Sequence, residues 1–172
     1  MALNSTQLAA LKAAILADTD PAVIAARAIR NDNELARLYN LPSTFVVWRS
    51  SIQTSDIGRC TIGQAQGIYV AIDNMTALNQ DRLRLFVQIN PTSFVATADL
   101  DALLNGIFSG TLGGGGQPTR DALHALLRRF ATKAENVQGV GGKSGAGSDA
   151  SPGNLAWEGA ITYADVGVAM NN

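Results

Sequence analysis

The chain has 172 residues, enough for one domain with a modest core. Its hydrophobic content of 47% excludes disorder of the whole chain, and its net charge of −1 excludes a strongly basic protein that binds mainly by neutralising phosphates. Cys60 is the single cysteine, which excludes an internal disulfide framework and favours the reducing cytosol, or a particle assembled there.

The apolar residues predict a thin core. Aromatic residues make up only 6% of the chain, and much of the apolar fraction is alanine, which buries little area. A protein of this kind often completes its burial against neighbouring molecules.

The N-terminus carries no sign of a targeting segment. Residues 1–6 lack the basic start and apolar block of a signal peptide. No apolar run approaches the ~18 residues that a membrane span needs. We therefore expect a protein that is made and used in soluble form, with no membrane partner.

The first part of the chain predicts short helices. Asn4 to Thr6 offer capping side chains before apolar residues at helical spacing. Asp20 can cap a second helix, and Pro21 suits its first position. Segments 22–29 and 34–39 continue the helical pattern.

The middle of the chain predicts two longer helices. The run 45–48 is apolar and compact, and periodicity leaves a short strand and a buried helical turn equally open. Residues 62–89 carry one apolar stripe and predict a helix of about 40 Å, which Pro91 ends. Residues 97–108 predict the next helix, which ends at Gly110.

Glycine dominates the last third of the chain. Residues 106–167 hold 14 of the 17 glycines. Gly113 to Gly116 form a flexible break, and 120–136 predict a last amphipathic helix. Residues 137–151 are rich in glycine and serine, so we expect a mobile or extended loop.

The tail, 152–172, turns apolar again and is the most informative segment. Its residues 155–161 alternate between larger apolar side chains or glycine and other residues, which favours an extended, strand-like arm. We expect Leu155, Trp157, Ile161 and Tyr163 to be its anchors. The arm could fold back onto its own helices or reach a neighbouring subunit, because about 13 flexible residues span about 20 Å.

The sequence shows no set of residues that is typical of a catalytic site. His124 is the only histidine and Cys60 the only cysteine, so no cluster for zinc or a similar metal is expected. Gly141 to Ser144 resemble the end of a phosphate-binding loop, but Val137 stands where that loop needs glycine. We expect no enzyme and no cofactor.

The basic residues Arg128, Arg129 and Lys133 form one cluster. Near a helix C-terminus they suit the helix dipole. Contact with an acidic partner surface, or with nucleic acid in a channel, is the functional alternative.

Motifs at both ends resemble a known family. The N-terminal motifs are Leu8-x-x-Leu11-Lys12-x-x-Ile15-x-Ala17-Asp18 and Val46-x-Trp48-Arg49. The C-terminal motifs are Ala131-Thr132-Lys133-Ala134-Glu135, then Leu155-Ala156-Trp157-Glu158-Gly159-Ala160-Ile161-Thr162 and Asp165-Val166. Together they are similar to small structural proteins of tailed bacteriophages, most closely the head-to-tail connector or adaptor type.

The resemblance implies a mainly helical virion protein, assembled in the host cytoplasm. It would form a ring, commonly a dodecamer, below the portal protein, grip the portal with C-terminal arms and receive tail proteins. DNA would pass through the channel without sequence recognition. A tail-completion or minor capsid protein would show the same organisation.

The sequence thus predicts a mainly α fold, a small helical bundle with a glycine-linked C-terminal arm that can hold a short strand or hairpin. The expected division is a helical body at 1–130, and a helix end, linker and docking arm at 131–172. The expected interface residues are Leu155, Trp157, Ile161, Tyr163, Arg128, Arg129 and Lys133. The rival functions are a DNA-binding packaging accessory and, less consistent with the residue inventory, a small lysis enzyme.

Overall fold

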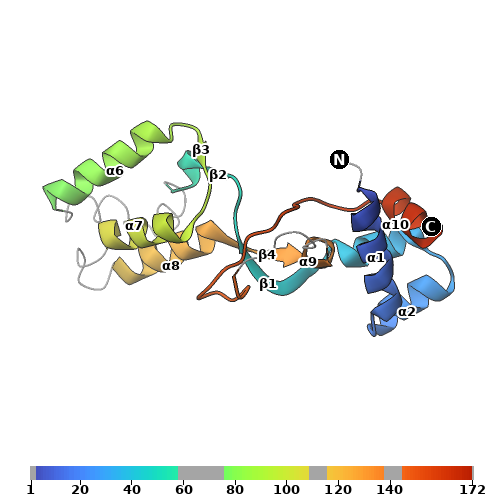
Figure 1. Ribbon diagram of the computed structural model, residues 1–172. Coiled ribbons are helices and arrows are strands. Elements are labelled where there is room, and N and C mark those ends of the chain that lie inside the picture. The colour runs from blue at the N-terminus through green and yellow to red at the C-terminus, as the bar shows by residue number, and fades with distance from the viewer. Residues whose placement is uncertain (1–2, 58–75, 109–115, 138–144, 172) are drawn as a thin grey trace. The chain divides into compact units, whose positions relative to one another are not determined.

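The computed structural model describes residues 3–57, 76–108, 116–137 and 145–171 (Figure 1). The chain forms two compact units. Unit 1 comprises Met1–Val47 and Phe130–Asn172, and unit 2 comprises Trp48–Arg129. Most described elements are helices, which confirms the predicted mainly α class.

Unit 1 contains the helices α1 (Ser5–Ala17), α2 (Pro21–Ala28), α3 (Asp32–Tyr39), α9 (Lys133–Val137) and α10 (Tyr163–Asn171). Asn4, Asp20 and Asn31 cap the first three helices, each accepting a hydrogen bond from a backbone N–H in the first turn. The C-terminal helix α10 packs against both α1 and α3 (Figure 1). The two ends of the chain therefore share one core.

The core of unit 1 gathers apolar residues from residues 3–39 and 134–169. Its buried members are Leu3, Leu11, Ile15, Val23, Ala26, Leu35, Ala36, Leu38, Tyr39, Ala134, Ile161, Val166 and Ala169. The expected division after residue 130 therefore does not follow the compact units. Residues 130–172 belong with the N-terminal helices because Ile161 and α10 bury their apolar side chains there.

The apolar run at 45–48 lies in a strand, which resolves the alternative left open by periodicity. Strand β1 (Pro42–Trp48) pairs with β4 (Arg128–Thr132). In unit 1, the Val46 N–H donates to the Gly147 carbonyl at 2.8 Å, and the Gly153 N–H donates to the Val46 carbonyl at 2.9 Å. The segment around 147–153 thus lies along β1.

Gly147 is required at its position. Its φ is +66°, and a Cβ there would overlap the ring of Phe45. Only glycine combines that backbone conformation with such a close approach. The glycine-rich stretch is in this part a packed segment rather than a free linker.

Unit 2 contains β2 (Ile52–Gln53), α6 (Ala77–Ile89), β3 (Ser93–Phe94), α7 (Ala98–Phe108) and α8 (Gly116–Leu127). The short strands β2 and β3 are antiparallel, and α7 packs against α6 and α8. The buried core residues are Trp48, Ile52, Ile57, Phe86, Phe94, Ala96, Leu104, Ile107, Phe108, Leu123 and Leu127.

Two helices have other bounds in the structure than the sequence predicts. The helix expected at 62–89 is helical from Ala77, because the Thr76 side chain caps that helix in an extended backbone conformation. The rest of that prediction, up to residue 75, lies outside the described residues. The helix expected at 120–136 ends at Leu127 and is followed by β4 and by α9. Backbone and side-chain groups of residues 41–49 bind this stretch, as in the bond from the Lys133 N–H to the Leu41 carbonyl at 2.9 Å.

Candidate docking surface

The predicted docking arm folds back onto its own unit. Ile161 is 3% exposed and belongs to the core of unit 1. The side chain of Asn40 fixes it: Nδ2 donates to the Ile161 carbonyl at 2.8 Å, and Oδ1 accepts from the Ile161 N–H at 2.9 Å. Ile161 is therefore an internal anchor, and its prediction as an interface residue is corrected.

A buried carboxylate holds the segment that precedes Ile161. Glu135 is 4% exposed, and its Oε1 accepts from the Gly159 N–H at 3.0 Å. Its Oε2 accepts from the Thr132 N–H at 2.8 Å, while the Thr132 hydroxyl accepts from the Glu135 N–H at 3.1 Å. Glu135 thus ties the start of α9 to the tail.

The tail ends in a helix, and the segment 155–161 before it, where alternation predicts an extended strand, forms no strand. The Thr162 N–H and hydroxyl both donate to Asp165 Oδ2, at 2.8 and 2.7 Å, and the Asp165 N–H donates back to the Thr162 hydroxyl. Partial burial raises the pKa of Asp165, but hydrogen bonds from Thr162 and from the Leu3 backbone outweigh it and hold the pKa below its usual 3.8. This reciprocal cap starts α10.

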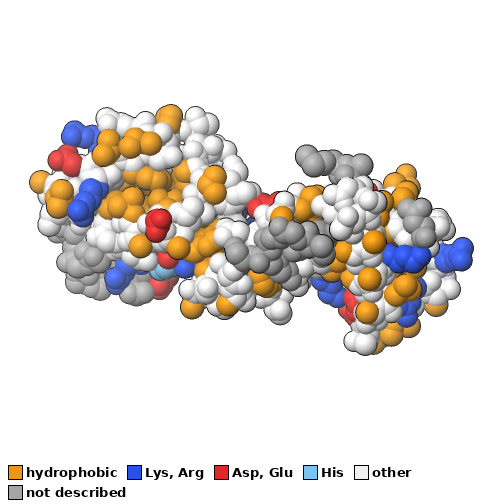
Figure 2. All heavy atoms as spheres, in the orientation of Figure 1, with side chains coloured by type: hydrophobic (Ala, Val, Ile, Leu, Met, Phe, Trp, Pro, Cys, Tyr) orange, Lys and Arg blue, Asp and Glu red, His pale blue; other side chains and the backbone are white. Residues whose placement is uncertain are grey.

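Three of the four predicted anchors keep some exposure. Tyr163 is 62% exposed at the first position of α10. Trp157 is half-buried and packs against the core of unit 1, and Leu155 is also half-buried. Figure 2 shows apolar side chains lying among charged ones on the visible face. Tyr163 is the predicted anchor that the fold leaves most available to a partner.

Arg128 lies in unit 2 and is buried, at 9% exposure, so it is not an exposed interface cation. Its Nη2 donates to Asp101 Oδ2 at 3.1 Å, and its Nη1 contacts the ring of His124. Asp101 Oδ1 lies 2.8 Å from His124 Nδ1, and the guanidinium carbon lies 4.9 Å from the Trp48 ring centroid. These contacts pair the charge of Arg128 within unit 2. They also link Asp101 of α7 to His124 of α8.

The other two basic residues do not complete a patch with Arg128. Arg129 is half-buried and belongs to unit 2, whereas Lys133 belongs to unit 1. Lys133 Nζ pairs with Asp20 Oδ2 at 3.2 Å. A bond from the Ala22 N–H and the bond from Lys133 lower the pKa of Asp20. Arg128 and Lys133 of the predicted cluster therefore each pair with an aspartate of their own unit.

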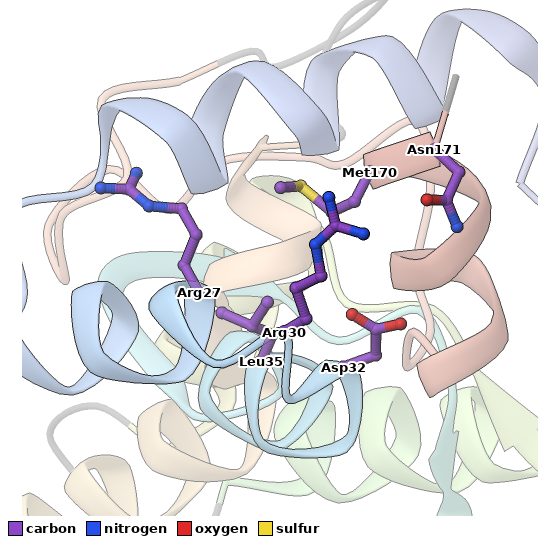
Figure 3. A pocket seen from close by; sticks show the side chains of 6 residues that line it. All are labelled: Arg27, Arg30, Asp32, Leu35, Met170 and Asn171. Carbon is purple, nitrogen blue, oxygen red and sulfur yellow. The ribbon is translucent and has the colours of Figure 1, made fainter.

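A charged pocket of about 230 Å³ lies in unit 1 among α2, α3 and α10 (Figure 3). It is lined by Arg27, Arg30, Asp32, Leu35, Met170 and Asn171. The Arg27 Nη1 donates to the carbonyls of Ile15 and Leu16 at 2.9 and 2.7 Å, so that guanidinium is held against the end of α1.

Local signals could have revealed part of this arrangement. Thr132-x-x-Glu135 and Thr162-x-x-Asp165 both fit the spacing of a reciprocal helix cap. The contact of Asn40 with Ile161 had no local signal, because it joins distant parts of the chain. Nor did any pattern single out the pocket, which three helices build together.

In the parts of the chain that the structure describes, no group of three or more histidine, cysteine, aspartate or glutamate side chains is placed to hold a metal ion. Over the same residues, no helix has the length and apolar character to cross a membrane. Comparison with protein-family models, with curated proteins and with solved structures found no match to this chain.

Proposed function

We propose that the protein is a structural component of a tailed-bacteriophage particle, a head-to-tail connector. In this role it forms a ring below the portal and joins the portal to tail proteins. The proposal comes from the motifs at the two ends of the chain. Its main structural support is Tyr163, a large aromatic side chain left exposed on a helix that the core of unit 1 holds in place.

An exposed aromatic on a fixed helix is well suited to binding. Tyrosine is enriched among the residues that contribute most to interface energy. The burial of Ile161 and Val166 sets the orientation of α10 before any partner arrives, so little ordering cost remains to be met on binding. Half-buried Trp157 and Leu155 lie in the same segment and can extend the contact.

The test is a mass measurement by light scattering on the purified protein, alone and mixed with portal rings of the same phage. We expect the wild-type chain to add to the rings. Tyr163→Ala should weaken that addition about tenfold or more. Leu78→Ala, at an exposed leucine of α6 in unit 2, is the matched control and should bind like wild type.

A wild-type chain that stays monomeric with and without portal rings would contradict the connector function. If Tyr163→Ala and the wild-type chain bind the rings equally well, the connector function still holds but Tyr163 is not part of the interface. The two failures are therefore distinct.

A further inference from the structure

Arg30 adopts a backbone conformation that arginine rarely takes. Its φ is +52°, the single positive value among the described non-glycine residues. It follows the C-terminus of α2, where the Arg30 N–H donates to the Arg27 carbonyl and the Asn31 N–H donates to the Ala26 carbonyl. Glycine is the residue usually found at this place in such a helix end. The backbone conformation at position 30 therefore favours glycine over arginine.

The Arg30 side chain is exposed and enters the charged pocket. Figure 3 shows it reaching beside Met170, with Asp32 on the side of α10. Among the described residues no hydrogen bond or ion pair involves its guanidinium, whereas that of Arg27 is held by two carbonyls. Two arginines and one aspartate give the lining a formal charge of +1 (+2 − 1).

One exposed side chain next to Arg30 is apolar. Ile29 is 74% exposed, directly before Arg30 in the chain. A guanidinium next to an exposed apolar side chain is a common composition at the centre of protein interfaces, where arginine binds carboxylates through two parallel bonds.

We propose that this pocket receives the carboxylate of an aspartate or glutamate side chain from a protein partner. Arg30 binds the carboxylate, Met170 contacts its methylene groups, and Ile29 packs against the partner beside it. This inference does not depend on the connector function. Arg30 thus places a cationic side chain in the pocket at a position where glycine would suit the backbone better.

The binding test uses the full chain with carbon-13 labelled methionine methyl groups. Met170 is one of three methionines, and its signal is assigned with Met170→Leu. The probe is N-acetylglutamate methylamide, with the glutamine analogue at the same ionic strength as its uncharged control. We expect a saturable shift of the Met170 methyl with the glutamate probe and no shift with the glutamine probe.

Two substitutions then test Arg30 itself. Arg30→Gln should weaken binding of the probe about tenfold or more, while Arg37→Gln, at an exposed arginine of α3, should leave it unchanged. Arg30→Gly should abolish binding and raise the temperature of unfolding by a few degrees. This opposite change in binding and stability separates a binding residue from a structural one.

Four results would overturn the proposal: equal shifts with both probes, unchanged binding by Arg30→Gln, a lower unfolding temperature for Arg30→Gly, or tighter binding of inorganic phosphate than of the glutamate probe. The last would assign the pocket to phosphate groups instead of carboxylates.

Discussion

The side-chain amide of Asn40 binds both backbone groups of Ile161, a residue 121 positions further along the chain. The two hydrogen bonds, of 2.8 and 2.9 Å, attach the start of the C-terminal helix to the end of α3. Together with the burial of Ile161 and α10, this contact holds the tail in unit 1.

Asn40→Ala should therefore loosen the tail. It removes two hydrogen bonds and leaves a partly buried N–H and carbonyl without their partner, a loss of about 2–3 kcal/mol in the free energy of unfolding. Urea denaturation gives that loss, and amide exchange should rise along α10. Asn33→Ala, at an exposed position of α3, is the matched control and should change little. Equal losses in the two variants would show that the contact with Ile161 contributes nothing.

Ile161→Ala and Tyr163→Ala should differ strongly in their effect on stability. Ile161→Ala opens a cavity in the core and should lower the free energy of unfolding by about 2–5 kcal/mol. Tyr163→Ala removes an exposed ring and should stay within about 0.5 kcal/mol of wild type. Urea denaturation of both variants checks this. A large loss for Tyr163→Ala would mean that its ring supports the fold and is not reserved for a partner.

Local signals predicted the helix starts well. Asn4 and Asp20 act as the caps that the sequence indicated, because capping depends on residues within one turn. Helix ends that depend on distant partners were predicted wrongly. Leu123, Leu127 and Phe130 keep helical spacing, yet the chain leaves the helix after Leu127 to pair with β1, and no local pattern contains that information.

The candidate docking residues also differ from their predictions wherever contacts between distant residues decide their exposure. The sequence named Ile161 and Tyr163 as equivalent anchors, because both are large and apolar and stand two residues apart. The fold separates them: one enters the core and the other faces solvent, since α10 begins between them. Arg128 was expected to be exposed because its partners Asp101 and Trp48 are far away in the chain.

Asp165 should make the docking of α10 sensitive to acid. Its pKa is lower in the folded chain than its usual 3.8, so the folded state binds fewer protons. The stabilisation is fully present above pH 3.8 and is lost as the pH falls through the lowered folded pKa. Asp165→Ala should cost about 1 kcal/mol at neutral pH, with a smaller loss on acidification.

Amide exchange of α10 between pH 5 and pH 3, corrected for the intrinsic rate, measures this effect. Thr162→Val, which removes the hydroxyl that bonds to Asp165, should show part of the same change. Identical acid profiles for wild type and Asp165→Ala would refute the assignment.

Arg128→Met should strongly destabilise unit 2. The substitution keeps an apolar stem near Trp48 but leaves the carboxylate of Asp101 with His124 alone, at a cost of about 3–5 kcal/mol. Arg84→Met breaks an ion pair between exposed side chains on α6 of the same unit and should cost under about 1 kcal/mol.

Urea denaturation followed by the fluorescence of Trp48, in a Trp157→Phe background, reports on unit 2. A double-mutant cycle with Asp101→Asn should return a coupling of about 0.5–3 kcal/mol. Zero coupling, or equal losses for the two arginine variants, would mean that the pairing of Arg128 with Asp101 does not hold α7 to α8.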